Sequence, residues 1–251
     1  MNKLFASMAY ASEFSLDDPR TTYFRKELIQ RKSFLKFIYT EWYKSLNISP
    51  DQIVIELGSG GGFLSEIFPN VITTEVFFTP LVNIINDARF ICFRPDSIDL
   101  LVLVDVFHHI PDVDKFLKSA GECLKPGGKI VMIEPWNTPW SSLVFRYLHP
   151  EPFDVHANWT IFPTGPLSGA NGALPWIVFQ RDYDVFCSQF PLLHIKDTNL
   201  LMPIAYLLSG GLTRYTFVPG YLYRFCRFFE RFLPHKLFAM FARVELQKSF
   251  S

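Results

Sequence analysis

Residues 53–63 read IVIELGSGGGF. The apolar, β-branched start of this run is typical of a strand that is buried on both faces of a parallel sheet. An acid, Glu56, stands near the end of the strand, and four of the five residues 58–62 are glycines. Glycines remove side chains from the following turn, so a ligand can lie against bare backbone where the next helix begins. The run therefore predicts an α/β fold with a ligand-binding turn after its first strand.

The glycine spacing distinguishes between several ligands. A dinucleotide fingerprint has glycines at its first, third and sixth positions, and here Phe63 occupies the sixth. A phosphate-binding P-loop ends in Gly-Lys-Ser/Thr, and this loop has no lysine. The remaining pattern, acid-apolar-Gly-x-Gly-x-Gly, resembles motif I of the class I S-adenosylmethionine-dependent methyltransferases, and a turn without a ligand is the alternative. The resemblance implies that the loop holds the amino-acid end of the cofactor S-adenosylmethionine, through Glu56, Gly58, Ser59, Gly60, Gly62 and Phe63.

A second apolar run that ends in an acid follows at residues 71–75, which read VITTE. The resemblance implies that Glu75 binds the two ribose hydroxyls, since a carboxylate offers two acceptor oxygens to a vicinal diol. The alternative is an exposed charge at the strand end. Farther along, the resemblance implies that Asp87 and Ala88 contact the adenine ring. The connection between these sites is short and contains a proline, so we expect the helix after the second strand to be abbreviated or remodelled.

Two later segments extend the resemblance. Residues 105–112 read DVFHHIPD, which is similar to the segment after the fourth strand in the type 11 small-molecule branch of the family. This similarity implies that Asp105 and His108 contact the cofactor or shape its site. Residues 124–129 read LKPGGK, which is similar to the turn before the fifth strand. The resemblance is thus continuous over about residues 52–135.

The resemblance implies a Rossmann-like α/β fold: a seven-stranded, mostly parallel sheet with helices on both faces and a terminal antiparallel strand pair. The spacing of apolar residues predicts one helix over residues 21–45, packed on or over the cofactor site. We expect an N-terminal helical segment at residues 1–50 and the methyltransferase domain at residues 51–251. Long irregular insertions at about 136–181 and 200–235 should bind the acceptor. Further strands and helices are expected at residues 63–68, 71–75, 98–106, 113–123, 130–134, 182–190, 192–195 and 238–246.

Methyl transfer from a sulfonium is an in-line displacement that requires neither a covalent nucleophile nor a metal, so we expect no metal site. A general base is needed when the acceptor is a hydroxyl. Histidine titrates near neutral pH, and the candidate catalytic residues are His109, His149 and His156. A structural histidine at the strand-helix turn is the alternative for His109. For the segment 149–156, which holds two imidazoles and two carboxylates, the alternatives are a polar loop and a metal site.

The composition argues against several classes of partner and site. The chain has 24 Lys+Arg and 24 Asp+Glu, so no global field favours nucleic acid. From residue 211 onward there are seven Lys/Arg and two acids, a local balance of +5. The four cysteines form no Cys-x-x-Cys pair, which argues against a zinc site or disulfide framework and favours a cytoplasmic location. No apolar run reaches the roughly eighteen residues of a membrane span.

Residues 221–238 combine arginines with phenylalanines. Arg224, Arg227 and Arg231 recur at helical spacing, and four phenylalanines recur on an adjoining face. One interpretation is a helix that contacts the inner face of the membrane, through anionic lipid headgroups or an amphipathic acceptor. The other interpretation, which we favour from the sequence, is a helix whose aromatic face packs on the domain and whose arginines are solvated.

Together these features predict an S-adenosylmethionine-dependent methyltransferase that acts on a small-molecule or lipid- or glycan-linked acceptor, with O-methylation favoured. The alternative is a noncatalytic protein of the same fold that serves as a partner or a membrane-associated scaffold, because the second half of the chain has no recognisable acceptor motif. The sequence leaves the oligomeric state open.

Overall fold

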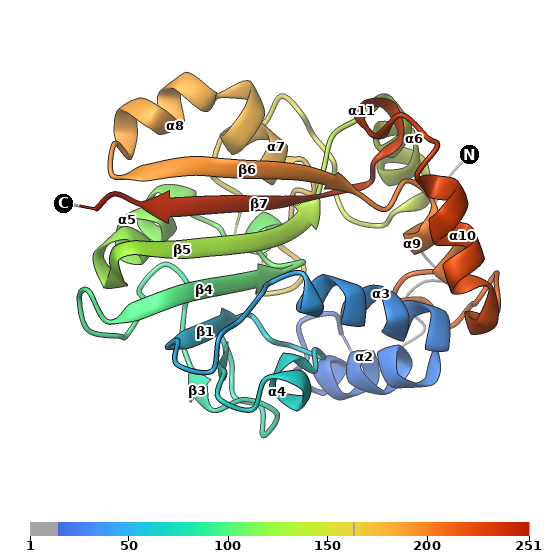
Figure 1. Cartoon of the computed structure of the whole chain (residues 1–251), viewed down its shortest axis with the longest axis horizontal. Helices are drawn as coiled ribbons and strands as arrows, with labels where there is room; N and C mark the ends of the chain where they lie inside the picture. Colours follow the sequence, from blue (N-terminus) through green and yellow to red (C-terminus); the bar gives the residue numbers. More distant parts are fainter. Residues whose placement is uncertain (1–14, 163, 251) are drawn as a thin grey trace.

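The computed structural model describes residues 15–162 and 164–250, so residues 1–14 of the expected N-terminal segment lie outside the described part. The strands are β1 (Val54–Leu57), β2 (Ile72–Glu75), β3 (Ile84–Ile85), β4 (Ile98–Val104), β5 (Leu124–Pro135), β6 (Leu193–Leu201) and β7 (Phe241–Lys248). They form one seven-stranded sheet in the order β3-β2-β1-β4-β5-β7-β6 (Figure 1). β7 runs antiparallel to both of its neighbours, and all other neighbouring strands are parallel. The predicted mostly parallel sheet with a terminal antiparallel pair is confirmed.

Helices connect and cover the strands. The α-helices are α2 (Arg20–Arg31), α3 (Ser33–Lys44), α4 (Leu64–Ile67), α5 (Val113–Cys123), α6 (Pro139–Leu148), α7 (Leu174–Trp176), α8 (Tyr183–Gln189), α9 (Ala205–Ser209), α10 (Tyr223–Glu230) and α11 (His235–Phe238). Shorter helical turns are η1 (Phe107–His109), η2 (Ile177–Arg181) and η3 (Gly220–Leu222). The helices α2, α3, α9 and α10 gather at the end of the sheet where β1 and β4 terminate (Figure 1). This end therefore combines the first and last thirds of the chain.

The core follows the central strands. Every residue of β1 is buried, and β4 is buried over most of its length. Strands covered on both faces carry near-continuous apolar runs, which explains why these segments read so clearly in the sequence. The helix α5 packs its apolar side against this sheet, and the Asp112 side chain caps its first turn by accepting a hydrogen bond from the Lys115 nitrogen at 3.1 Å. These elements hold the carboxyl end of β4 in place.

The single helix predicted over residues 21–45 is wrong, because α2 and α3 are separated at Lys32. Lys32 leaves the helical conformation with φ −90° and ψ 89°. Its Nζ donates hydrogen bonds to the carbonyl oxygens of Gly211 at 2.7 Å and Thr213 at 3.0 Å. Burial lowers the pKa of Lys32 to about 8. A buried amino group requires partners, so this distant contact overrides the local helical periodicity.

Other predicted bounds also differ. β5 begins at Leu124, within the segment expected to be a turn, and β6 continues to Leu201. The chain forms no helix between β2 and β3, as the short connection predicted. The insertions expected to be irregular contain short helices, α6 and α7 in the first and α9 and α10 in the second. None of the helices in residues 15–162 and 164–250 combines the length and hydrophobicity that a bilayer span requires.

Candidate active site

Two adjoining cavities lie at the carboxyl ends of the parallel strands, where open α/β sheets usually bind ligands. The first, which we call the glycine-loop cavity, has a volume of about 470 Å³. The second, which we call the apolar cavity, has a volume of about 400 Å³. Both fall within the range of ~300–1,000 Å³ that is typical of small-molecule sites. Arg25, Asp105 and His109 line both cavities.

The first two glycines of the loop shape the glycine-loop cavity. Gly58 and Gly60 line it, and both adopt left-handed backbone angles, with φ of 63° and 47°. A Cβ atom on Gly58 would lie 2.7 Å from a methyl carbon of Val106. A side chain at this position would therefore be strained and would displace the residue after Asp105.

The last two glycines of the loop have a different role. A Cβ atom on Gly61 would lie 2.6 Å from the backbone nitrogen of Lys26 in α2, and one on Gly62 would lie 2.6 Å from the Tyr43 hydroxyl of α3. That hydroxyl also accepts a hydrogen bond from the backbone nitrogen of Phe63 at 3.4 Å. Gly61 and Gly62 thus allow the N-terminal helices to approach the loop closely.

Glu75 holds the loop from the end of β2. Its Oε2 accepts a hydrogen bond from the Gly60 nitrogen at 3.0 Å, and its Oε1 accepts one from the Val76 nitrogen at 2.9 Å. Burial raises the pKa of Glu75, and the two backbone hydrogen bonds partly offset this effect. The side chain is buried yet lines the cavity, so the alternative of an exposed charge at the strand end is wrong.

The segment after β3 forms another wall of the glycine-loop cavity through Asn86, Asp87 and Ala88. Burial would raise the pKa of Asp87, but the Arg89 guanidinium, 2.6 Å from its Oδ2, lowers it overall. The Asn86 Oδ1 accepts a hydrogen bond from the Cys92 nitrogen at 2.8 Å. Its buried Nδ2 has no hydrogen-bond partner among the described residues. Asn86 therefore lines the cavity while its buried amide donor has no partner among the described residues, a feature that sequence reasoning missed.

Asp105 stands at the boundary of the two cavities, immediately after β4. Its φ is 62°, a strained conformation that aspartate tolerates better than most residues. Burial raises the pKa of Asp105 to about 6. Glu134 of β5 fixes the following turn, because its Oε1 accepts hydrogen bonds from the nitrogens of Val106 and Phe107, each at 2.8 Å. A strained acid held by its surroundings is typical of a functional position.

His108 lines neither cavity, although it was expected to contact the cofactor or shape its site. Its buried ring has Nδ1 2.7 Å from Oε2 of Glu134 and Nε2 3.4 Å from Oε2 of Glu151. Burial would lower the pKa of His108, but the hydrogen bonds to these two carboxylates raise it well above its ordinary value. Of the two expected roles, the geometry favours shaping the site.

His109 faces both cavities with a defined tautomer. Its Nδ1 donates a hydrogen bond to the Gly169 carbonyl oxygen at 3.0 Å, since a carbonyl can only accept. Burial, followed by the positive charge of His108, lowers the pKa of His109 to about 4. The neutral ring therefore has its lone pair on Nε2, which lies 3.9 Å from Oε1 of Glu151. This nitrogen can accept a proton at the boundary between the cavities.

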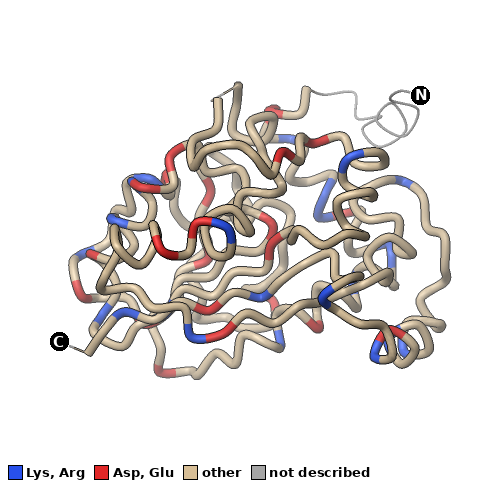
Figure 2. Tube along the Cα trace, turned by 90° about the horizontal axis from the view of Figure 1, so that it is seen from above, with Lys and Arg blue, Asp and Glu red and all other residues tan. Residues whose placement is uncertain are grey.

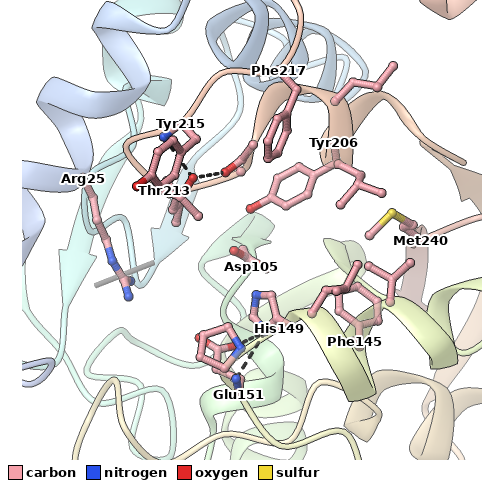
Figure 3. A pocket seen from close by; sticks show the side chains of 18 of the residues that line it. Arg25, Asp105, Phe145, His149, Glu151, Tyr206, Thr213, Tyr215, Phe217 and Met240 are labelled. Carbon is pink, nitrogen blue, oxygen red and sulfur yellow. Dashed lines mark hydrogen bonds and ion pairs between the residues drawn. The ribbon is translucent and has the colours of Figure 1, made fainter. Parts of the chain in front are cut away.

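His149 and Glu151 complete the polar end of the apolar cavity (Figure 3). The Glu151 nitrogen donates a hydrogen bond to Nδ1 of His149 at 3.3 Å. Burial lowers the pKa of His149, so its neutral ring carries the proton on Nε2. Burial would raise the pKa of Glu151, but the hydrogen bond from His108 and the positive charge of that ring lower it strongly. The polar end of the apolar cavity thus combines a proton acceptor (Nε2 of His109), a hydrogen-bond donor (Nε2 of His149) and the carboxylate of Glu151.

The rest of the apolar cavity comes from three segments of the second half of the chain. Aliphatic and aromatic side chains dominate it: Val144, Phe145, Leu148, Tyr206, Leu207, Leu208, Leu212, Phe217 and Met240. Leu148, Tyr215 and Phe217 are 43%, 48% and 59% exposed and therefore form its rim. The cavity suits an amphipathic molecule whose polar end lies near Asp105.

Several residues that the sequence singled out do not reach either cavity. Four residues in or beside the glycine loop line neither cavity and instead support the loop: Glu56, Ser59, Gly62 and Phe63. Burial raises the pKa of Glu56 to about 8, and its Oε2 has no hydrogen-bond partner among the described residues. His156 is exposed, and its backbone nitrogen donates a hydrogen bond to Oδ1 of Asp154. The structure therefore gives no support to a catalytic His156.

Sequence reasoning also missed residues that line the glycine-loop cavity. Thr22 and Arg25 come from α2, and residues 164–167 come from the loop between α6 and α7. Neither segment has a local motif, since both reach the cavity through tertiary packing. The expectation that an N-terminal helix lies at the cofactor site was the one available signal for Arg25.

A metal ion could fit beside the boundary of the cavities. His108, His109 and Glu151 each place one ligand atom within 4.8 Å of the others. In the described structure the two imidazoles lie beside the Glu151 carboxylate instead, with Nε2 of His108 at 3.4 Å and Nε2 of His109 at 3.9 Å from its oxygens. The expected absence of a metal site stays a prediction.

One comparison with known proteins identifies the family of the chain. A family model described as a methyltransferase domain matches residues 26–165, just over half of the chain. A highly reducing polyketide synthase of Gibberella zeae is 41% identical over 57 residues, which are 22% of this chain and 2% of the length of that relative.

Two solved structures cover nearly the whole chain. The geranyl diphosphate C-methyltransferase of Streptomyces coelicolor A3(2), solved with Mg²⁺, geranyl diphosphate and S-adenosyl-L-homocysteine, has a TM-score of 0.50 at 14% identity and covers 97% of this chain and 90% of its own. A chain of the complex between the Haloferax volcanii Trm112 methyltransferase activator and its candidate methyltransferase has a TM-score of 0.52 at 11% identity, with coverages of 95% and 99%. At these identities the structural matches show a shared fold.

Proposed function

Because the chain belongs to the class I S-adenosylmethionine-dependent methyltransferases, we propose that it transfers a methyl group to a small-molecule acceptor held in the apolar cavity. Bound S-adenosylmethionine supplies an electrophilic methyl group. The observation that carries the proposal is that Arg25, Asp105 and His109 line both cavities. Because the two cavities adjoin at these residues, an acceptor atom in the apolar cavity can approach the methyl group of a cofactor in the glycine-loop cavity directly, with water excluded.

The walls of the glycine-loop cavity fit this cofactor. Gly58 and Gly60 offer bare backbone to its amino-acid end. Glu75 offers a buried carboxylate to the ribose hydroxyls. Asp87 and Ala88 line the same cavity and would face the adenine ring. These assignments match the roles that the family resemblance implies.

We assign three further roles on the same basis. The Arg25 guanidinium would pair with the carboxylate of the cofactor, and Asp105 with its amino group. Asn86 would donate its unused amide hydrogen to the nucleoside. The predicted residues that line neither cavity would stabilise the loop and the turn after β4 without touching the cofactor: Glu56, Ser59, Gly62, Phe63 and His108.

His109 is the proposed proton acceptor, which favours O-methylation. Its lowered pKa keeps Nε2 unprotonated at neutral pH, and the Glu151 carboxylate would stabilise the imidazolium as the acceptor hydroxyl loses its proton. His149 would donate a hydrogen bond that orients the acceptor. The His109 and His149 rings are neutral before transfer, so an acceptor hydroxyl can bind both without displacing a charge from either ring.

The acceptor is proposed to be an amphipathic small molecule, either free or lipid- or glycan-linked. The polar end of the apolar cavity faces the cofactor side, and its remaining walls are apolar. A cytoplasmic location, with peripheral contact to the inner face of the membrane through residues 221–238, belongs to the same proposal. The N-terminal segment, up to residue 50, would act as part of one catalytic unit with residues 51–251, because α2 lines both cavities.

Calorimetry of the full chain with S-adenosylmethionine and S-adenosylhomocysteine tests the proposal. We expect both to bind, and Asp87→Ala to weaken binding about tenfold by loss of a hydrogen bond to a charged group. The exposed acid Glu122 provides a matched control, and Glu122→Gln should leave affinity unchanged. Absence of binding to either compound would overturn the proposal, whereas an unaffected Asp87→Ala would overturn only the adenine assignment.

A further inference from the structure

Helix α10 presents its aromatic face to solvent. Phe225, Phe228, Phe229 and Phe232 are 61%, 52%, 50% and 72% exposed. Their rings contact one another. The ring centroids are 4.6 Å apart for Phe225 and Phe229, 5.5 Å apart for Phe228 and Phe229, and 5.4 Å apart for Phe228 and Phe232. The interpretation that this face packs on the domain is therefore wrong. A contiguous exposed apolar patch of this kind marks an interaction surface.

The opposite face of α10 packs on the domain and carries a charged pair. Arg227 pairs with Glu41 of α3, with 2.6 Å between Nη2 and Oε1, and also with Glu230. Glu230 is fully buried, and its Oε1 accepts hydrogen bonds from the nitrogens of Ile204 and Ala205 at the start of α9. The helix is thus fixed with its charged pair inward and its phenylalanines outward, the reverse of a helix that packs by its apolar face.

The charges beside this patch are basic. Over the whole trace, basic and acidic residues are interspersed (Figure 2). Residues 211–240 instead contain five Lys/Arg and one acid, and that acid is the buried Glu230. Arg224, Arg231 and Lys236 are exposed in the same segment as the phenylalanines. Apolar rings flanked by cations complement a surface that is both apolar and anionic, which is the property of a lipid bilayer with acidic headgroups.

The patch continues along the chain to the rim of the apolar cavity. Tyr215 and Phe217 line the cavity and are about half-exposed. Tyr221 follows Phe217 by four residues, which limits their separation to about 14 Å, and it is 83% exposed. Exposed aromatic side chains therefore extend from the cavity rim to α10.

We infer that α10 and the aromatic residues before it form a docking surface for an anionic bilayer, from which the acceptor enters the apolar cavity. The identity of the cavity as the acceptor site rests on the proposed function. The phenylalanines insert between lipids at the interface, and the arginines bind headgroup phosphates. The substrate class that this arrangement selects is a membrane-anchored amphiphile whose polar end carries the hydroxyl.

Co-sedimentation of the full chain with lipid vesicles tests this inference. We expect binding to phosphatidylglycerol/phosphatidylcholine vesicles, weaker at high salt, and little binding to phosphatidylcholine alone. Arg224→Gln/Arg231→Gln should weaken binding by about 25-fold at low salt, at about fivefold for each charge. Phe225→Ser/Phe228→Ser/Phe232→Ser should weaken it at least about tenfold, because three buried rings are lost from the interface.

Matched variants remove similar groups elsewhere. Phe78 is 71% exposed and lies outside the patch, and Arg94 and Lys118 are exposed. Phe78→Ser and Arg94→Gln/Lys118→Gln should bind anionic vesicles as the unchanged chain does. The affinity for S-adenosylmethionine, measured on every variant, verifies folding, and Phe232→Ser alone, just outside α10, substitutes for a triple variant that fails to fold.

Three outcomes overturn the docking surface: negligible binding to both vesicle types, equal loss in the matched variants, or a concentration-dependent dimer that the phenylalanine variant abolishes while no vesicles bind. The last would assign the patch to a second copy of the chain. Binding of S-adenosylmethionine without vesicle binding overturns this inference alone. Vesicle binding without S-adenosylmethionine binding overturns the proposed function and leaves the docking surface standing.

Discussion

The glycine-loop cavity and the apolar cavity share a wall but are assembled in different ways. The first takes most of its lining from the residues that follow β1, β2, β3 and β4, so each contribution is placed by a strand of the sheet. The second takes its lining from α6, α9 and the loops at residues 149–151 and 210–217. A strand end is positioned by the hydrogen bonds of the sheet, whereas a loop is positioned by whichever side chains it happens to contact.

The two cavities therefore differ in which features the backbone fixes and which features depend on exchangeable side chains. Under the proposed function, cofactor binding would depend on backbone geometry, such as the left-handed angles at Gly58 and Gly60. Acceptor binding would depend on side chains that could be exchanged without disturbing the sheet. Substitutions in the two cavities should therefore affect different measurements, and Asp105, which lines both cavities and is assigned to the cofactor, should affect both.

The largest effect on cofactor affinity is expected in the glycine-loop cavity. Gly58→Ala would place a Cβ 2.7 Å from Val106 at a φ of +63°, which combines a left-handed penalty with a steric clash, together about 2–4 kcal/mol. We expect the affinity for S-adenosylmethionine, measured by calorimetry, to fall by at least about 30-fold. The matched change Gly121→Ala, where a Cβ would lie 4.0 Å from Leu193, should have no such effect. A Gly58→Ala protein that binds normally would contradict the dependence on backbone geometry.

The next effect belongs to the acceptor side. His109→Gln should lower transfer of tritium from methyl-labelled S-adenosylmethionine into a lipid extract of the source cells by roughly 10²–10⁴-fold, because the proton acceptor is lost. Cofactor affinity should change little, since the assigned contacts to the cofactor come from other residues. The exposed His194 supplies the control, as His194→Gln should leave both quantities unchanged. Equal loss of affinity and transfer would place His109 with the cofactor instead.

Asp105, at the boundary, should trade stability against activity. Burial raises its pKa to about 6 from an ordinary value of 3.8, so the folded state binds more protons than the unfolded state between these pH values. The free energy of unfolding should therefore fall as pH rises from about 4 to 6. Asp105→Asn should remove this dependence, stabilise the protein by roughly 1–3 kcal/mol at pH 8, and weaken cofactor binding. Urea unfolding at pH 4 and pH 8 measures the difference, and an unchanged pH dependence in the variant would remove Asp105 as its source.

The smallest effect is expected from chelation. If His108, His109 and Glu151 act through hydrogen bonds and proton transfer, excess EDTA should change methyl transfer less than about twofold, and adding Zn²⁺ or Mg²⁺ should not increase it. A large loss that a divalent ion restores would show that these three residues bind a metal.

Much of the lining of the glycine-loop cavity was readable in the sequence because these residues stand next to strands. Buried strands are recognisable in the sequence as apolar runs. Five lining residues each follow such a run or its connection: Gly58, Gly60, Glu75, Asp87 and Asp105. Arg25 and Asn86 were not predicted, since neither an arginine in a helix nor an asparagine in a loop indicates by itself which way it points. The motif also included glycines that serve helix packing, and a linear pattern cannot separate these from glycines that face a ligand.

The acceptor half was predictable only as a region. Two of its three candidate histidines line the apolar cavity, yet nothing local distinguishes them from the exposed His156. The orientation of α10 was predicted wrongly because the periodicity of its phenylalanines is the same whichever face is buried. The decisive interaction, Arg227 with Glu41, joins residues 186 positions apart. The break at Lys32 was missed for the same reason.

The contact of Lys32 with Gly211, 179 residues farther along the chain, has a consequence for biosynthesis. While the ribosome is still translating the first four-fifths of the chain, this amino group has no partner that would justify its burial, so α2 and α3 should not take up their final arrangement. The part of α2 that lines both cavities is translated early, but it should reach its final position only near the end of synthesis. We therefore expect nascent chains shorter than about 215 residues to lack affinity for the cofactor, even though every strand-end motif for it has already emerged.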